Sequence, residues 1–156
     1  MSNLSRLFAP SVAALVLAAM PALAAPTEET GPIHFAAALS PDEQSAPTYS
    51  DATGHGDFVL DRATLTLSWT ITFKDLSTPI TAAHIHGPQR PGTNAGILID
   101  VGDKGLKSPL KDSFVLNEGL LEYLLAGRLY VNIHTTKYKD GELRGQLERQ
   151  LPPVTN

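Results

Sequence analysis

Cysteine is absent from the 156 residues of this chain. Its absence excludes disulfides, thiolate metal sites, cysteine nucleophiles and lipidated cysteines. The sequence also contains no Gly-x-Ser-x-Gly, no His-Glu-x-x-His, no EF-hand loop and no Gly-Lys-Ser/Thr phosphate loop. No motif therefore supports a hydrolase or a phosphate-binding loop.

The sequence also lacks an apolar run long enough for a comfortable membrane span. Residues 7–19 are almost wholly apolar, but Pro10 interrupts the run and Pro21 follows it. Residues 22–24, Ala-Leu-Ala, fit the small-x-small pattern after which a signal peptidase cuts. We therefore expect residues 1–24 to be a secretory signal peptide, with no membrane span after its cleavage. The mature protein would be exported, either periplasmic or secreted.

Positive charge is scarce as well. Removing residues 1–24 from the 156 leaves 132 residues, and because Arg6 leaves with them, 11 basic side chains face 16 acidic ones, a net charge of −5. This balance argues against nucleic acid and anionic lipid as partners, since both attract basic surfaces. A chain of this length can bury a core without disulfides, and it suits one domain.

Strand patterns dominate the rest of the sequence. Between Thr64 and Phe73, apolar residues at odd positions alternate with Thr and Ser at even positions, as in a strand with one buried face. Shorter strands are expected at 33–39, 56–61, 83–86, 97–101, 113–116, 129–135 and 142–148, with loops at 40–54, 89–96 and 102–112. Short alternating strands separated by turn signals predict an all-β fold, a single β-sandwich of Greek-key or Ig-like antiparallel sheets.

One segment has the period of a helix instead. Asn117 suits an N-cap, leucines at 120, 121, 124 and 125 form an apolar stripe, and Gly127 suits the position after a helix. We expect one short helix near 118–126. Further along, Asp140-Gly141 predicts a hairpin turn before the last strand. Residues 25–32 are expected to be a flexible lead-in and residues 150–156 a loose tail.

Histidines provide the strongest candidate site. His84 and His86 are two residues apart, so on a strand they share one face, and His134 shares a face with Asn132 and Tyr130 in the same way. If the two strands are neighbours, three imidazoles meet. Neutral imidazoles bind copper or zinc, and three of them leave a coordination position open.

Other roles for these residues remain open. The histidines could instead form a structural hydrogen-bond cluster with backbone carbonyls, or a surface for a ligand or partner. A fourth ligand or hydrogen-bond acceptor could come from Asp57, Asp100 or Glu142. Glu142 and Arg144 are expected to be a solvated pair beside the site. His55, between two glycines, is expected in an exposed loop.

An ordered series of motifs resembles the CHRD domain, which is named after repeats in chordin. The series is Ala83-His84-Ile85-His86-Gly87-Pro88, Gly92-Thr93-Asn94, Leu124 with Gly127, Tyr130-Val131-Asn132-Ile133-His134-Thr135, and Gly141-Glu142-Leu143-Arg144-Gly145-Gln146. The resemblance covers about Ile33 to Leu147, and we take residues 33–149 as the domain. It implies an exported protein, because chordin is secreted and binds growth factors and the bacterial members are mostly short exported proteins without an established activity.

The expected function is therefore a non-catalytic binding or structural module that holds a transition metal, copper or zinc, through His84, His86 and His134. One alternative is a copper- or zinc-dependent metalloenzyme, since His-x-His on a strand of an exported sandwich resembles the local geometry of copper/zinc superoxide dismutase. Another is a module that binds an extracellular protein partner, as chordin repeats do.

Overall fold

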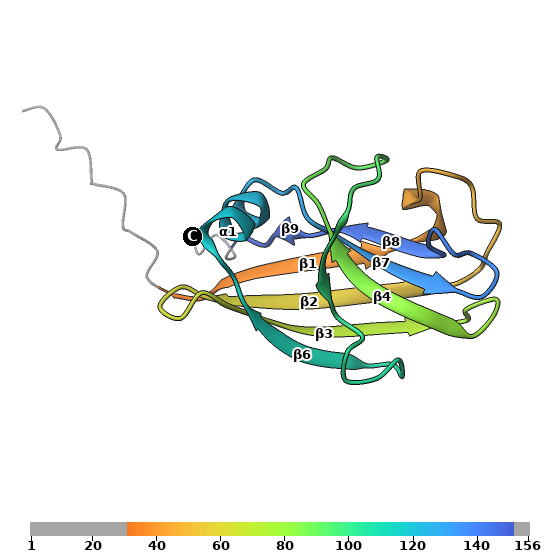
Figure 1. The fold of residues 1–156 in the computed structure, drawn as a ribbon, viewed down its shortest axis with the longest axis horizontal. Helices are drawn as coiled ribbons and strands as arrows, with labels where there is room; N and C mark the ends of the chain where they lie inside the picture. Colours follow the sequence, from red (N-terminus) through yellow and green to blue (C-terminus); the bar gives the residue numbers. More distant parts are fainter. Residues whose placement is uncertain (1–30, 152–156) are drawn as a thin grey trace, which may run out of the picture.

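Two antiparallel sheets pack face to face in the computed structural model, which describes residues 31–151 (Figure 1). The five-stranded sheet has the order β6-β3-β2-β1-β9 and the four-stranded sheet the order β5-β4-β7-β8. In the first sheet lie β1 (Ile33–Leu39), β2 (Thr53–Asp61), β3 (Thr66–Lys74), β6 (Leu110–Val115) and β9 (Glu148–Arg149). In the second lie β4 (Ile80–His86), β5 (Ile97–Asp100), β7 (Tyr130–Thr135) and β8 (Leu143–Gln146). The predicted all-β sandwich is confirmed.

The core lies between the sheets and is built by the alternation seen in the sequence. In β3, Leu67, Trp69 and Ile71 are buried, while Ser68 on the other face is exposed. From the facing sheet, Ile85 of β4 and the apolar residues of β7 close the same core. The alternate residues of β4 and β7 point away from this core, and these positions include the polar side chains.

The start of β3 differs from the prediction. The strand begins at Thr66 and not at Thr64, because residues 62–65 form a turn in which Leu65 has a φ of +54°. The side chain of Asp61 holds this turn by accepting hydrogen bonds from the backbone N–H groups of Ala63 and Thr64. The predicted loops at 40–54 and 102–112 also end early, because β2 already begins at Thr53 and β6 at Leu110; the first contains the short 3-10 helix η1 (Pro41–Glu43).

The predicted helix is confirmed as α1 (Glu118–Leu125), which lies at one end of the sandwich (Figure 1). The side chain of Asn117 caps it by accepting a hydrogen bond from the backbone N–H of Leu120 at 2.9 Å. Gly127 has a φ of +66°, the left-handed conformation that ends many helices. Leu124 anchors the helix in the core.

The last predicted strand, 142–148, is wrong as a single element. β8 ends at Gln146 in the four-stranded sheet, and β9 pairs with β1 in the other sheet. Leu147 makes the crossing: its side chain is buried in the core and its N–H donates to the carbonyl of Leu129. The Asp140-Gly141 turn does join β7 to β8, but through the longer connection 136–142.

Three predicted segments lie wholly or partly outside residues 31–151. The expected signal peptide at 1–24 lies outside the described residues, as do 25–30 of the expected lead-in and 152–156 of the expected tail. Within residues 31–151, no helix has the length and apolar character needed to cross a membrane.

Candidate metal centre

The histidines of interest lie on the outward face of the four-stranded sheet. β4 and β7 are antiparallel neighbours, and their register sets His84 opposite Asn132, His86 opposite Tyr130 and Ala82 opposite His134. The condition set by the sequence, that the two strands be adjacent, is therefore met. His84, His86 and His134 are brought together as predicted.

The three imidazole rings form a tight cluster. Their centroids lie 5.5 Å apart for His84 and His86, 5.0 Å for His84 and His134, and 5.6 Å for His86 and His134. One ring nitrogen from each residue lies within 4.8 Å of the others. Around one ion each metal–nitrogen bond would be about 2.0–2.1 Å, so binding would draw the three nitrogens closer together.

Backbone carbonyls fix the tautomers of two rings. The Nδ1 of His86 lies 3.0 Å from the carbonyl oxygen of Ala95, and the Nδ1 of His134 lies 2.8 Å from that of Lys139. A carbonyl only accepts, so each Nδ1 donates a proton and each Nε2 keeps its lone pair. This is the arrangement that orients histidine ligands in metal sites.

Each of the three residues also has a buried ring nitrogen without a hydrogen-bond partner in the described part of the chain. These atoms are Nδ1 of His84, Nε2 of His86 and Nε2 of His134. A buried polar atom without a partner is costly, and native proteins rarely keep one without a reason such as an ion. The bonds of His86 and His134 to backbone carbonyls are those of a structural cluster, but they leave one nitrogen of each ring, and Nδ1 of His84, without a partner in the described residues.

Burial favours the neutral form of two rings. Desolvation lowers the pKa of His84, the nearby His134 lowers it further, and the charge of Asp100 opposes the change. Desolvation also lowers the pKa of His86, against the opposing hydrogen bond to Ala95, with His134 and His84 contributing in the same direction as burial. Neutral imidazoles, the form that binds metal, are thus available at neutral pH.

Tyr130 supports the cluster from beside His86. The two rings stack with centroids 5.2 Å apart and an interplanar angle of 10°. The hydroxyl of Tyr130 accepts a hydrogen bond from the N–H of Ala95, the same residue whose carbonyl accepts from His86. The guanidinium of Arg144 lies over the Tyr130 ring at 3.9 Å from its centroid.

The predicted solvated pair of Arg144 and Glu142 is wrong, because Arg144 is fully buried. It donates to the carbonyls of Glu43, Arg90 and Thr93 and to the side chain of Gln146. These carbonyls belong to loops that fold over the outward face of the sheet. Arg144 therefore holds these segments against the four-stranded sheet.

Glu142 is also fully buried, and its carboxylate accepts from Ser50, Ser77 and Thr135. Asn132 links two further loops: its side-chain oxygen accepts from Gln44 and its amide donates to the carbonyl of Asp140, both at 2.8 Å. Of the supporting residues named from the sequence, Tyr130 contacts a histidine ring, whereas Asn132, Glu142 and Arg144 hold loops against the sheet.

The carboxylates considered as a fourth ligand do not join the cluster, which consists of the three histidines. Asp100 is opposite His84 on β5, but it is exposed and one of its oxygens accepts from the N–H of Gly102. Asp57 lies in the other sheet, 3.2 Å from His55. Glu142 is occupied by its own donors.

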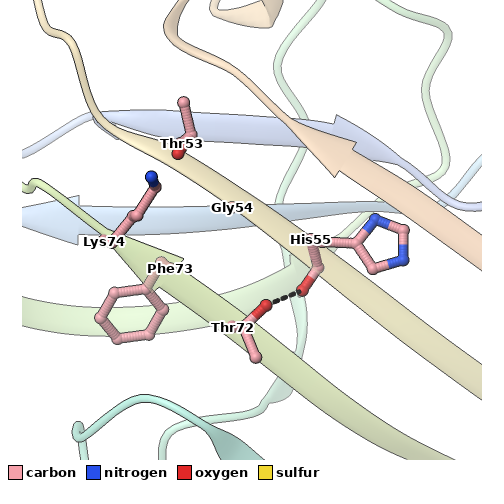
Figure 2. A pocket seen from close by; sticks show the side chains of 6 residues that line it. All are labelled: Thr53, Gly54, His55, Thr72, Phe73 and Lys74. Carbon is pink, nitrogen blue, oxygen red and sulfur yellow. Dashed lines mark hydrogen bonds between the residues drawn. The ribbon is translucent and has the colours of Figure 1, made fainter.

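His55 is exposed as expected, but it lies on β2 and not in a loop. It lines a pocket on the five-stranded sheet with Thr53, Gly54, Thr72, Phe73 and Lys74 (Figure 2). In Figure 2 its ring projects away from Phe73 and Lys74. No second His and no Asp or Glu is among the residues that line this pocket.

Backbone carbonyls were considered from the sequence as partners of the histidines, but those of Ala95 and Lys139 were not identified. Backbone oxygens carry no side-chain signature, so no sequence pattern marks them as partners of His86 and His134. Gly87-Pro88, which follows His86 directly, gave a hint, since it predicts that the chain turns there toward the loop at 89–96.

Fold and site together define an antiparallel β-sandwich that carries a three-histidine cluster on one sheet. The model of the CHRD domain family matches residues 35–147, which include every histidine of the cluster and all four supporting residues. The chain belongs to the CHRD domain family. No curated protein and no solved structure matches it.

Proposed function

We propose that this protein is an exported, non-catalytic binding module that holds copper or zinc through His84, His86 and His134. The observation that carries the proposal is the convergence of three buried, unpartnered imidazole nitrogens within one cluster. Membership of the CHRD family supports a binding module.

The donor set narrows the choice of metal. Imidazole suits copper and zinc, whereas calcium and magnesium prefer oxygen ligands, and the cluster contains no carboxylate. Three protein nitrogens leave further coordination positions to water or another ligand.

Metal content of the purified mature protein, measured by elemental mass spectrometry after native purification without a tag, tests the proposal. Wild type should contain one equivalent, and alanine at position 84, 86 or 134 should weaken binding by about tenfold or more, as loss of a ligand or its orienting partner does. His55→Ala is the matched control, because His55 is an exposed histidine on the other sheet. Wild type that takes up neither metal, or single variants that all retain it, would refute the proposal.

The open coordination position favours one second function, a redox enzyme of the superoxide dismutase type. Such an enzyme needs a position where substrate reaches the ion, and three histidine ligands provide it. Turnover of superoxide that disappears with His86→Ala would establish this function, and metal binding without turnover would leave the binding module.

An extracellular protein partner is the remaining alternative. Phe114 and Val115 of β6 are 41% and 65% exposed and lie on the five-stranded sheet, away from the histidines. Val115→Ser should then reduce capture of the partner while leaving metal content unchanged.

Export itself is tested by N-terminal sequencing of the protein recovered from the periplasm and from the medium. A mature chain that begins at Ala25 is expected, and a full-length chain in the cytoplasm would contradict export.

A further inference from the structure

We infer that the three-histidine cluster binds copper as Cu(I) in preference to Cu(II) and Zn(II). This inference rests on the proposed metal function and concerns which ion the site accepts. Three features of the described residues carry it: the neutrality of the ligands, a buried cation behind one ligand, and the number of nitrogens offered.

The ligand set brings no negative charge to the ion. The cluster consists of three imidazoles, and the carboxylates of Glu142 and Asp100 make hydrogen bonds of their own. A bound dication therefore keeps its full charge of two. The cost of removing an ion from water grows with the square of its charge, so partial burial penalises a dication about four times as much as a monocation.

Arg144 adds a positive charge behind the site. Its guanidinium lies 3.9 Å from the centroid of Tyr130, whose ring stacks on His86 at 5.2 Å. Arg144 is fully buried, whereas the side chain of Glu43, 4.0 Å away, is 46% exposed, so solvent screens the negative partner more strongly. The remaining positive potential repels a dication twice as strongly as a monocation.

Three nitrogens also match the coordination that Cu(I) accepts. A d¹⁰ monocation is stable with three ligands, whereas Zn(II) takes four and Cu(II) prefers a tetragonal set. Hydrogen bonds to Ala95 and Lys139 hold the rings of His86 and His134 in place, so two of the three donors are preorganised. No fourth protein ligand joins the cluster within residues 31–151.

Asp100 acts in the opposite direction and supplies a sharp test. It is opposite His84 on β5, and its negative charge favours a positive charge on that ring. Asp100→Asn should therefore increase the preference for Cu(I). Glu43→Gln should do the same, because it leaves the charge of Arg144 less compensated. Asp57→Asn removes one exposed negative charge on the other sheet and is the matched control.

The experiment is a set of titrations of the purified mature protein. Cu(I) is added without oxygen in competition with bicinchoninate, and Cu(II) and Zn(II) are added separately in competition with a chromophoric chelator. We expect a dissociation constant for Cu(I) about 100-fold or more below those for the two dications, a gap that widens several-fold in Asp100→Asn and Glu43→Gln and is unchanged in Asp57→Asn. Circular dichroism checks that each variant is folded.

Outcomes separate this inference from the proposed function. Histidine-dependent binding in which Cu(II) or Zn(II) equals or exceeds Cu(I) would leave the metal function standing and overturn the preference. A preference that does not change in Asp100→Asn and Glu43→Gln would overturn its electrostatic basis. Wild type that binds none of the three ions would remove the proposed function and the inference together.

Discussion

Glu142 is a buried carboxylate whose charge is stabilised by hydrogen bonds from three parts of the chain. Ser50 donates at 2.6 Å, the N–H of Ser77 at 2.7 Å and the hydroxyl of Thr135 at 2.7 Å. Burial alone would raise the pKa of Glu142, but these donors outweigh it and hold the pKa below its ordinary value. The carboxylate thus joins two loops to β7 in its ionised form.

Glu142→Gln should lower the free energy of unfolding by about 1–3 kcal/mol at pH 7, because the amide nitrogen cannot accept from these donors. The lowered pKa stabilises wild type above the unfolded value of about 4.3, and this contribution is lost as pH falls through the folded pKa. The difference between wild type and variant should therefore shrink between pH 5 and pH 3, as measured by urea denaturation. Glu122→Gln, on the exposed side of α1, is the control and should differ little from wild type at either pH.

Gly141 and Gly105 allow backbone strain to be separated from lack of space. Their φ values are +125° and +127°, but a Cβ at Gly141 would overlap the side-chain amide of Asn132, whereas nothing lies within 4 Å of one at Gly105. Alanine at 105 should cost about 1–3 kcal/mol for strain. Alanine at 141 should cost about 1–3 kcal/mol more, for overpacking against Asn132. Equal losses in denaturant unfolding would show that the Asn132 contact is easily relieved.

Arg144 and Glu142 also show what the sequence could not predict at the residue scale. Alternation predicted that the two residues share one face, but Glu142 lies outside β8, and whether either side chain meets water depends on loops from distant parts of the chain. Arg144 bonds the carbonyl of Glu43 across 101 residues and that of Thr93 across 51. The local sequence pattern does not reveal such long-range contacts. The predicted solvated pair was therefore wrong.

At the scale of elements, the two faces of β3 should differ in their sensitivity to substitution. Leu67 is fully buried, paired with Leu60 of β2 and Phe114 of β6, whereas its neighbour Ser68 faces outward. Leu67→Ala should lower stability by about 2–5 kcal/mol, since it leaves a cavity between the sheets. Ser68→Ala should change it by about 0.5 kcal/mol or less. Midpoints of urea denaturation measure both, and similar midpoints would contradict the assignment of a buried and an exposed face.

Elements with strong local signals were predicted from the sequence, and those defined by tertiary contacts were not. α1 has its cap at Asn117 and its terminating glycine at Gly127, both of which act within a few residues. The division of the last strand into β8 and β9 has no such signal, because alternation continues unbroken through Leu147. Which sheet a residue joins depends on the strand that it meets.

At the scale of the whole molecule, the candidate site depends on the pairing of β4 with β7, two strands that are far apart in the sequence. The spacing of His84 and His86 and the parity of His134 predicted one face for each strand, but only the pairing of β4 with β7 brings the two faces together. The short alternating strands and the turn signals between them predicted the overall sandwich, which the structure confirms. The loops that cover the histidines, with their carbonyls at Ala95 and Lys139, follow from tertiary packing and not from any residue type.

The metal-free protein as a whole should lose stability as pH falls from 7 to 5. The pKa values of His84 and His86 are lowered in the folded state, so the unfolded chain, with histidine pKa values of about 6.5, takes up protons that the folded protein does not. Protonation therefore favours unfolding from about pH 6.5 downward, until the folded pKa values are reached. Urea denaturation with a chelator present, at pH 7, 6 and 5, measures the slope. His86→Gln should flatten this slope. A wild type whose stability is constant over this range would show that protonation of the cluster carries no such free-energy cost.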